Sequence, residues 1–208
     1  MDKIELEIIG LSYSQTQTGA YALVLGETVG NKRRLPIIIG GFEAQAIAIE
    51  LEAMTPSRPL THDLFKNLAD AFKINLLEVI IYNLVEGIFY AKLIIQQGTE
   101  TIEIDTRTSD AIALAVRFKC PISTYEFILS SAGIILDESQ KDKDSDDDDN
   151  NDFDELEKEL EDIDPSKPLD YSKMSITDLN KVLQNAIEHE NYEEASKIKA
   201  EIDKRNAN

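Results

Sequence analysis

The chain has 208 residues, 42% of them hydrophobic, and a formal net charge of −19, so it can form a core but is not a nucleic-acid-binding domain held by positive charge alone. A single cysteine, Cys120, excludes an intrachain disulfide framework and fits a reducing compartment. The longest apolar runs, such as residues 35–39, are too short to cross a bilayer, and the first ten residues are typical of a strand rather than a signal peptide, so we expect a cytoplasmic protein with no membrane partner.

Residues 1–137 alternate between strand and helix patterns. Apolar residues alternate with acidic ones from Ile4 to Ile8, as a half-buried strand requires. Glycine-containing turns separate the later apolar runs, and hairpins occupy the middle of this part. The pattern predicts an α+β fold with a mixed or antiparallel sheet and inserted helices. Strands are predicted at residues 4–8, 20–25, 35–39, 76–82, 87–95, 100–105 and from 121, and helices at 42–54, 62–72, 109–118 and 125–131.

Individual residues add local expectations. Pro36 has no N–H to donate, so its strand should lie at a sheet edge or begin at that point. Thr61 is expected to cap the helix that starts at His62, and Thr108 or Ser109 to cap the helix that follows.

The net negative charge is concentrated in residues 138–170, which carry 16 acidic and 4 basic side chains. Residues 1–137 have a net charge of −6 and residues 171–208 of −1. Because the acidic segment has few large apolar residues, it cannot bury enough surface to offset its ordering entropy. We therefore expect a disordered acidic linker over 138–170 between two folded parts.

Helical apolar spacing returns in residues 171–208 and predicts a hairpin of two short helices. About 34 residues cannot supply much core alone, so the hairpin is expected to bind a protein partner through residues 171–206, or its own copy as a homo-oligomer. The first stripe is Ile176, Leu179, Leu183, Ala186 and Ile187, and the second is Tyr192, Ala195, Ile198 and Ile202.

Three groups of residues are candidates for chemistry, and the first surrounds the helix after Gly41. Gly40 and Gly41 could expose backbone N–H groups to a phosphate, or simply form a tight turn from strand to helix. Glu43 and Glu50 are two helical turns apart on nearly the same face. Exposed helical glutamates are more often solvated than functional.

The second group is Arg58, His62 and Asp63, near the start of a helix. The helix dipole already accounts for an aspartate in the first turn. His62 is a candidate general acid or base or a metal ligand, but a local structural role is about equally well supported.

The third group runs from Asp105 to Asp110, where a strand ends and a helix begins. Capping explains Ser109 and Asp110, but not Asp105 and Arg107. Carboxylates at a strand end beside a helix can hold Mg²⁺ or Mn²⁺ with positions open to phosphate oxygens. An arginine nearby can contact the phosphate and stabilise developing charge.

Four blocks with suitable spacing carry a family resemblance. They are Leu35–Gly40 with Glu43, Ala44, Ala46 and Ile47; Arg58 and Pro59 with Thr61–Leu64; Phe89–Ala91 with Leu93; and Asp105, Arg107 and Ser109–Ala115 with Pro121 and Ile122. Over about residues 3–135 this pattern resembles the bifunctional nuclease (DNase/RNase) family. Thr108 departs from it, because the family usually has proline there. The resemblance implies DNA and RNA as substrates.

The C-terminal hairpin resembles the UVR motif, a short helical pair that implies protein–protein contact rather than catalysis. Leu179, Leu183, Ala186, Tyr192, Glu193, Ala195 and Ile198 fit it. Lys199 and Ala200 depart from the motif, which usually has an arginine–aspartate pair at this place.

These observations predict metal-assisted hydrolysis of phosphodiester bonds. Asp105, Asp110 and Glu43 are the predicted ligands of a divalent cation, Mg²⁺ or Mn²⁺. His62, Asp63, Asp105, Arg107 and Asp110 are the predicted catalytic residues, and Arg58, Arg107 and Ser109 are predicted to bind substrate.

The alternative is a non-enzymatic adaptor that recruits partners through the hairpin, with the polar groups acting only as caps, turns and salt bridges. Geometry separates the two hypotheses. Convergence of His62, Asp63, Asp105 and Arg107 supports an enzyme, and scattering over separate surfaces supports an adaptor.

Overall fold

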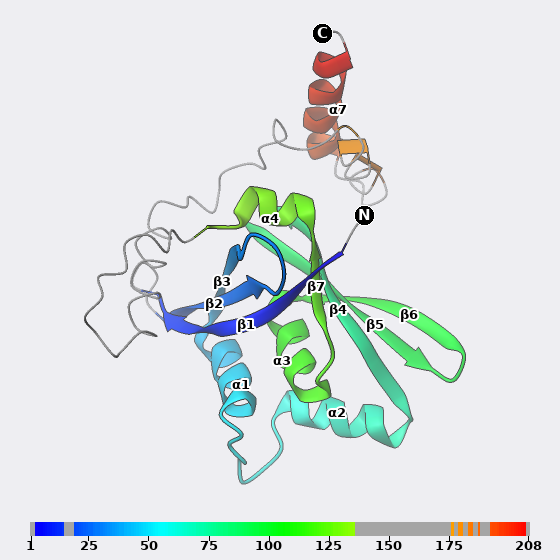
Figure 1. The fold of residues 1–208 in the computed structure, drawn as a ribbon. Coiled ribbons are helices and arrows are strands. Elements are labelled where there is room, and N and C mark those ends of the chain that lie inside the picture. The colour runs from blue at the N-terminus through cyan, green and yellow to red at the C-terminus, as the bar shows by residue number, and fades with distance from the viewer. Residues whose placement is uncertain are drawn as a thin grey trace, which may run out of the picture.

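The computed structural model describes residues 3–14, 19–135, 176, 179–180, 183–184, 187 and 192–206 (Figure 1). The predicted linker lies outside these residues, and the predicted C-terminal hairpin lies only partly within them. The strands are β1 (Lys3–Tyr13), β2 (Ala20–Glu27), β3 (Arg34–Gly40), β4 (Ile74–Val85), β5 (Ile88–Gln97), β6 (Glu100–Arg107) and β7 (Ile122–Tyr125). The helices are α1 (Gly41–Leu51), α2 (Thr61–Ala71), α3 (Thr108–Phe118), α4 (Glu126–Ala132) and α7 (Tyr192–Asn206).

Within the described residues the seven strands form one sheet in the order β3-β2-β1-β7-β4-β5-β6. Neighbouring strands are antiparallel except β4 and β7, which run parallel. The predicted α+β fold with a mixed sheet is therefore confirmed. Pro36 lies on β3, which is an edge strand. Its missing N–H therefore breaks no hydrogen bond to a further strand of the sheet.

Helices cover both faces of this sheet. Helices α1, α2 and α3 lie on one face and α4 on the other, and α3 contacts both α1 and α2 (Figure 1). Because α3 is enclosed by helices and strands, its residues from Ala111 to Ala115 are all buried.

A buried arginine fixes α4 to the turn between β2 and β3. Arg33 donates to Glu27 Oε1 at 2.9 Å and to Glu126 Oε1 at 2.7 Å. These hydrogen bonds from Arg33 hold the pKa of both glutamates below its usual range.

Helices α1, α2 and α3 each begin one residue earlier than predicted, and at α2 and α3 this changes the caps. Thr61 and Thr108 are the first helical residues, so neither they nor Ser109 caps the helix end. At α2 the Leu60 N–H donates to Asp63 Oδ2 at 2.8 Å. At α3 the hydroxyl of Thr108 instead donates to the carbonyl of Phe89, at 2.9 Å.

The C-terminal segment is helical where it is described. Ala195, Ile198 and Ile202 are buried along one side of α7, as the predicted second stripe requires, and Leu179 in the preceding helical residues is buried too. The UVR resemblance itself stays a prediction. None of the described helices has the length and apolar character needed to span a membrane.

Candidate functional site

Three helices begin close to one another on one face of the sheet. β3 leads directly into α1 and β6 leads directly into α3, so the sheet fixes where both helices start. Glu43, His62 and Asp110 lie in the first turns of α1, α2 and α3. Arg107 is the last residue of β6 and directly precedes α3.

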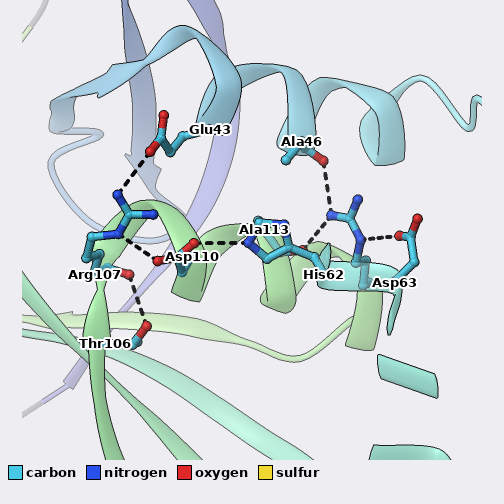
Figure 2. Close-up of polar contacts among 9 residues, drawn as sticks. Glu43, Ala46, His62, Asp63, Thr106, Arg107, Asp110 and Ala113 are labelled. Atoms are coloured by element: carbon cyan, nitrogen blue, oxygen red, sulfur yellow. Dashed lines mark hydrogen bonds and ion pairs between the residues drawn. The ribbon is translucent and has the colours of Figure 1, made fainter. Parts of the chain in front are cut away.

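Continuous polar contacts join these four side chains (Figure 2). Arg107 donates from Nη1 to Glu43 Oε1 at 3.0 Å and from Nε to Asp110 Oδ2 at 2.8 Å. The second carboxylate oxygen of Asp110, Oδ1, lies 3.1 Å from His62 Nε2. We call Glu43, His62, Arg107 and Asp110 the polar cluster.

Asp110 is the centre of the polar cluster and is ionised. Burial raises its pKa, but hydrogen bonds from Arg107 and His62 outweigh burial and place the pKa below the usual range. An ionised carboxylate accepts hydrogen bonds only, so His62 Nε2 carries the proton that points to Asp110. In the neutral imidazole, Nδ1 is then left with a lone pair that can accept a proton.

Arg107 is the accessible member of the polar cluster. Its side chain is 67% exposed, whereas those of Glu43, His62 and Asp110 are 28% exposed or less. The hydrogen bond to Asp110, followed by that to Glu43, raises the pKa of Arg107, so the guanidinium is permanently charged. A fixed positive charge at the surface of a polar cluster can bind a phosphate.

Gly40 gives Glu43 its position. A Cβ atom built on Gly40 would overlap the Glu43 carboxylate, so any side chain there would displace it. The Gly40–Gly41 pair forms a tight connection from strand to helix, one of the two interpretations that the sequence left open.

Asp63 faces away from the polar cluster and binds Arg117. Arg117 Nε donates to Asp63 Oδ1 at 2.7 Å, and Nη1 donates to the carbonyls of Ala46 and Ala113 at 3.0 and 2.8 Å (Figure 2). Burial raises the pKa of Asp63, but the Arg117 and Leu60 hydrogen bonds lower it below its usual range. Asp63 therefore has a structural role, the placement of α2.

Arg117 is a residue that sequence reasoning missed. Its side chain is almost fully buried, and its Nη2 has no hydrogen-bond partner among the described residues. It links α1, α2 and α3, the helices that carry the polar cluster. The sequence did carry a signal for Arg117, which is a lone arginine in an alanine- and leucine-rich helix. A charge buried in such a helix requires polar partners, so Arg117 could have been expected to bind other polar groups.

Asp105 also lies apart from the polar cluster. On β6, Asp105 lies opposite Lys92 of β5. The two neighbours of Lys92 along β5, Ala91 and Leu93, are buried beneath the helices. Successive side chains alternate between faces, so Asp105 points to the opposite face. There it accepts a hydrogen bond from Tyr82 at 3.0 Å, and burial together with this bond raises the pKa of Tyr82 to about 12.

The two other predicted substrate-binding residues have no side-chain hydrogen bond to any described residue. Arg58 is exposed in the connection between α1 and α2. Ser109 is buried in the first turn of α3, beside Asp110.

The predicted metal ligands do not assemble. In the part of the chain that the structure describes, no three His, Cys, Asp or Glu side chains are placed to hold a metal ion. Glu43 and Asp110 share Arg107, and Asp105 lies on the other face of the sheet. A cation between Glu43 and Asp110 would compete with Arg107 for the same carboxylates.

Known proteins share this part of the chain. The family model of the bifunctional nuclease domain matches residues 23–137, which include the whole polar cluster. An uncharacterized protein of Mycobacterium tuberculosis is 39% identical over 168 residues, covering 80% of this chain and 97% of that protein. Bifunctional nuclease 1 of Arabidopsis thaliana is 28% identical over 123 residues, covering 58% of this chain and 38% of the plant protein. Bifunctional nuclease 2 of Oryza sativa subsp. japonica is 29% identical over 116 residues, covering 54% and 36%.

Proposed function

Because the chain belongs to the bifunctional nuclease domain family, we propose that it hydrolyses phosphodiester bonds of DNA and RNA at the polar cluster. The observation that carries this proposal is Asp110, which contacts a histidine and an exposed arginine through its two oxygens. A proton acceptor and a phosphate-binding cation are thereby held together, as phosphodiester hydrolysis requires.

His62 acts as the general base. Asp110 orients the imidazole through Nε2, and Nδ1 accepts a proton from the attacking water. The water oxygen forms a bond to phosphorus and the bond to the leaving oxygen breaks. The leaving oxygen takes up a proton from solvent water, and His62 then releases to solvent the proton that it accepted. Because water is the nucleophile, the ribose 2′-hydroxyl is not needed, and both DNA and RNA can be substrates.

Arg107 stabilises the charge that develops on the phosphate oxygens. Glu43 and Asp110 fix the guanidinium in one orientation, which limits its reorganisation when substrate binds. The helix N-termini at this place add partial positive charge, which favours an anion beside the two carboxylates.

With Arg107 bound to Glu43 and Asp110, the donor set of the polar cluster does not fit a divalent cation. The requirement for Mg²⁺ or Mn²⁺ remains a prediction. Loss of activity with a chelator and its recovery with either metal would support the metal requirement. Binding of the metal would then require Arg107 to release Glu43 or Asp110.

The test is cleavage of single-stranded DNA and RNA by the purified chain, with Mg²⁺, with Mn²⁺ and with a chelator. Asp110→Asn keeps the shape of the side chain but removes its charge, and it should lower the cleavage rate about 100-fold or more. Wild-type activity in Asp110→Asn would refute the proposed role of the polar cluster.

Two further variants sharpen this test. Glu100→Gln removes an exposed carboxylate at the start of β6 and should leave the cleavage rate unchanged. Asp105→Asn separates the two interpretations of the aspartates. An effect as large as that of Asp110→Asn would support the sequence-based pairing of Asp105 with Asp110, and a small effect would support the polar cluster as described.

The adaptor hypothesis keeps some support from geometry, because Asp63 and Asp105 do not join His62 and Arg107. We propose that recruitment is an additional role of residues 171–206 rather than a replacement for catalysis. Loss of a bound protein partner on deletion of this segment, with nuclease activity retained, would support this division.

A further inference from the structure

Phe42 is the most exposed large apolar side chain among the described residues, with 88% of its surface open to solvent. It lies in the first turn of α1, directly after Gly41 and directly before Glu43. A single exposed apolar side chain is common on protein surfaces, so exposure alone assigns no role to Phe42. Its position beside the polar cluster does.

Only one side chain separates Phe42 from the exposed arginine of the polar cluster. Glu43, the next residue, accepts the hydrogen bond from Arg107 Nη1 at 3.0 Å (Figure 2). Side chains of a helix lean toward its N-terminus, so Phe42 lies at the same end of α1 as this contact. An exposed aromatic ring and an exposed cation therefore occur together at the start of α1.

The side of α1 that carries Phe42 faces α3. Ala46 is one helical turn after Phe42 and on the same side of the helix. Ala46 is buried, and Arg117 of α3 donates to its carbonyl at 3.0 Å. Phe42 is one turn before this contact, where α1 is open to solvent beside Arg107, the residue that precedes α3.

The backbone that carries Phe42 is fixed by β2. A Cβ atom built on Gly41 would lie 3.2 Å from the carbonyl oxygen of Gly19 and 3.7 Å from the ring of Tyr21. Tyr21 in turn contacts Tyr13 edge-on, with 5.4 Å between the ring centroids. Because the start of α1 is packed against this strand, a ligand that binds the Phe42 ring need not order the backbone beneath it.

The surroundings of Phe42 favour a nucleobase over an apolar protein surface. Its neighbours on α1 are Gly41, Glu43 and Gln45, which are small or polar, so they add no apolar patch of the size that protein partners use. An aromatic ring next to a fixed cation suits single-stranded nucleic acid, because the cation binds a phosphate and the ring stacks on a base. In a duplex both faces of a base are covered by its neighbours, so the ring cannot stack on it.

We propose that Phe42 stacks on an unpaired base next to the phosphate that Arg107 binds, and thereby selects single-stranded DNA and RNA. The proposal rests on the proposed function for the position of the phosphate. Every base has an aromatic face, so stacking on Phe42 selects for an unpaired strand and not for a sequence.

The first test measures binding of the full chain by fluorescence anisotropy. The two probes are single-stranded oligothymidylate with phosphorothioate linkages, which slow hydrolysis, and the same backbone with abasic residues in place of thymidine. The wild type should bind the thymidylate about tenfold more tightly than the abasic strand. Phe42→Leu should bind both equally, and Phe42→Trp, which keeps an aromatic ring, should retain the preference.

Phe72→Leu is the matched control for this test. Phe72 is also exposed, but it lies at the C-cap of α2, about 15 Å along the helix from His62 in the first turn. Phe72→Leu should therefore keep the tenfold preference for thymidylate. A Phe42→Leu variant that keeps the wild-type preference would overturn the proposal, as would a wild type that binds both strands equally.

The second test separates stacking from hydrolysis. Phe42→Leu should lower kcat/KM on single-stranded DNA about tenfold, mainly by raising KM, and leave kcat/KM on duplex DNA unchanged. Equal losses on both substrates would overturn the role of Phe42 in selecting an unpaired strand. A chain that shows the Phe42-dependent binding but cleaves neither substrate would refute the proposed function and retain the stacking site. Because the ring is exposed, thermal unfolding of Phe42→Leu should match that of the wild type.

Discussion

At the scale of single residues, Gly40 determines where Glu43 can lie. Gly40→Ala should displace the Glu43 carboxylate from Arg107, because the new Cβ and the carboxylate would occupy the same space. The displaced atoms are at the end of a side chain that can move, so we expect thermal stability near wild type and a cleavage rate lowered about tenfold. Steady-state kinetics with thermal unfolding measures both. Full activity would show that the contact of Glu43 with Arg107 is dispensable.

Thr108 is the residue at which the chain departs from the usual proline of the family. It is the first residue of α3, and Arg107 before it has φ −64° and ψ 144°, an extended conformation that proline tolerates in its predecessor. Thr108→Pro loses the hydrogen bond to Phe89 but restricts the unfolded chain.

The expected change in unfolding free energy for Thr108→Pro is within about 1 kcal/mol, measured by urea denaturation. Thr108→Val loses the same hydrogen bond without the proline effect and should be the less stable of the two. A loss of several kcal/mol in Thr108→Pro would show that the start of α3 cannot accept the proline ring.

At the scale of elements, Arg117 holds three helices together. Arg117→Met should lower the unfolding free energy by about 3 kcal/mol, because it leaves Asp63 without its charged partner and two carbonyls without a donor. Arg107→Met makes the same change at an exposed arginine and should cost less than about 1 kcal/mol. Equal losses in the two variants, measured by urea denaturation, would contradict the structural role of Arg117.

The pair Glu27 and Glu126 makes the attachment of α4 sensitive to acid. Their pKa values are lower in the folded chain than the ordinary 4.5, so folding stability gained from Arg33 is present above pH 4.5. It is lost as the pH falls through the folded pKa values. The unfolding free energy should therefore decrease below pH 4.5, and Glu126→Gln should show a smaller decrease. An identical pH dependence in the variant would contradict this.

The elements were predictable because their signals are local. Pro36 indicated a strand that lies at a sheet edge or begins at that point, and glycine-containing turns separated the predicted strands that became β4, β5 and β6. The polar cluster was predictable only in part. His62, Arg107, Asp110 and Glu43 come from distant points of the chain and meet, whereas Asp63 and Asp105 face other partners. Asp105 points away from the polar cluster because side chains alternate along β6, and Asp63 is held by the buried Arg117. Both outcomes depend on which face of the sheet α3 covers.

At the scale of the whole molecule, all seven strands of the described sheet lie within residues 3–135. A chain that ends at residue 137 should therefore keep the fold of the sheet and its helices and, on the proposed function, the cleavage rate of the full chain. Circular dichroism and the cleavage assay check this expectation. An unfolded product would show that the C-terminal segment contributes to the stability of the first part.

The central position of β7 has a consequence for how the chain folds. β1-β2-β3 and β4-β5-β6 are two meanders of sequential neighbours, whereas β7 joins them and pairs Lys3 with Tyr125. Each meander can form early from contacts close in sequence, but closing the sheet must wait for β7, which is synthesised last among the described strands. Until then the edges of β1 and β4 stay unpaired, so insertion of β7 is the step at which this chain is most exposed to strand exchange with another copy.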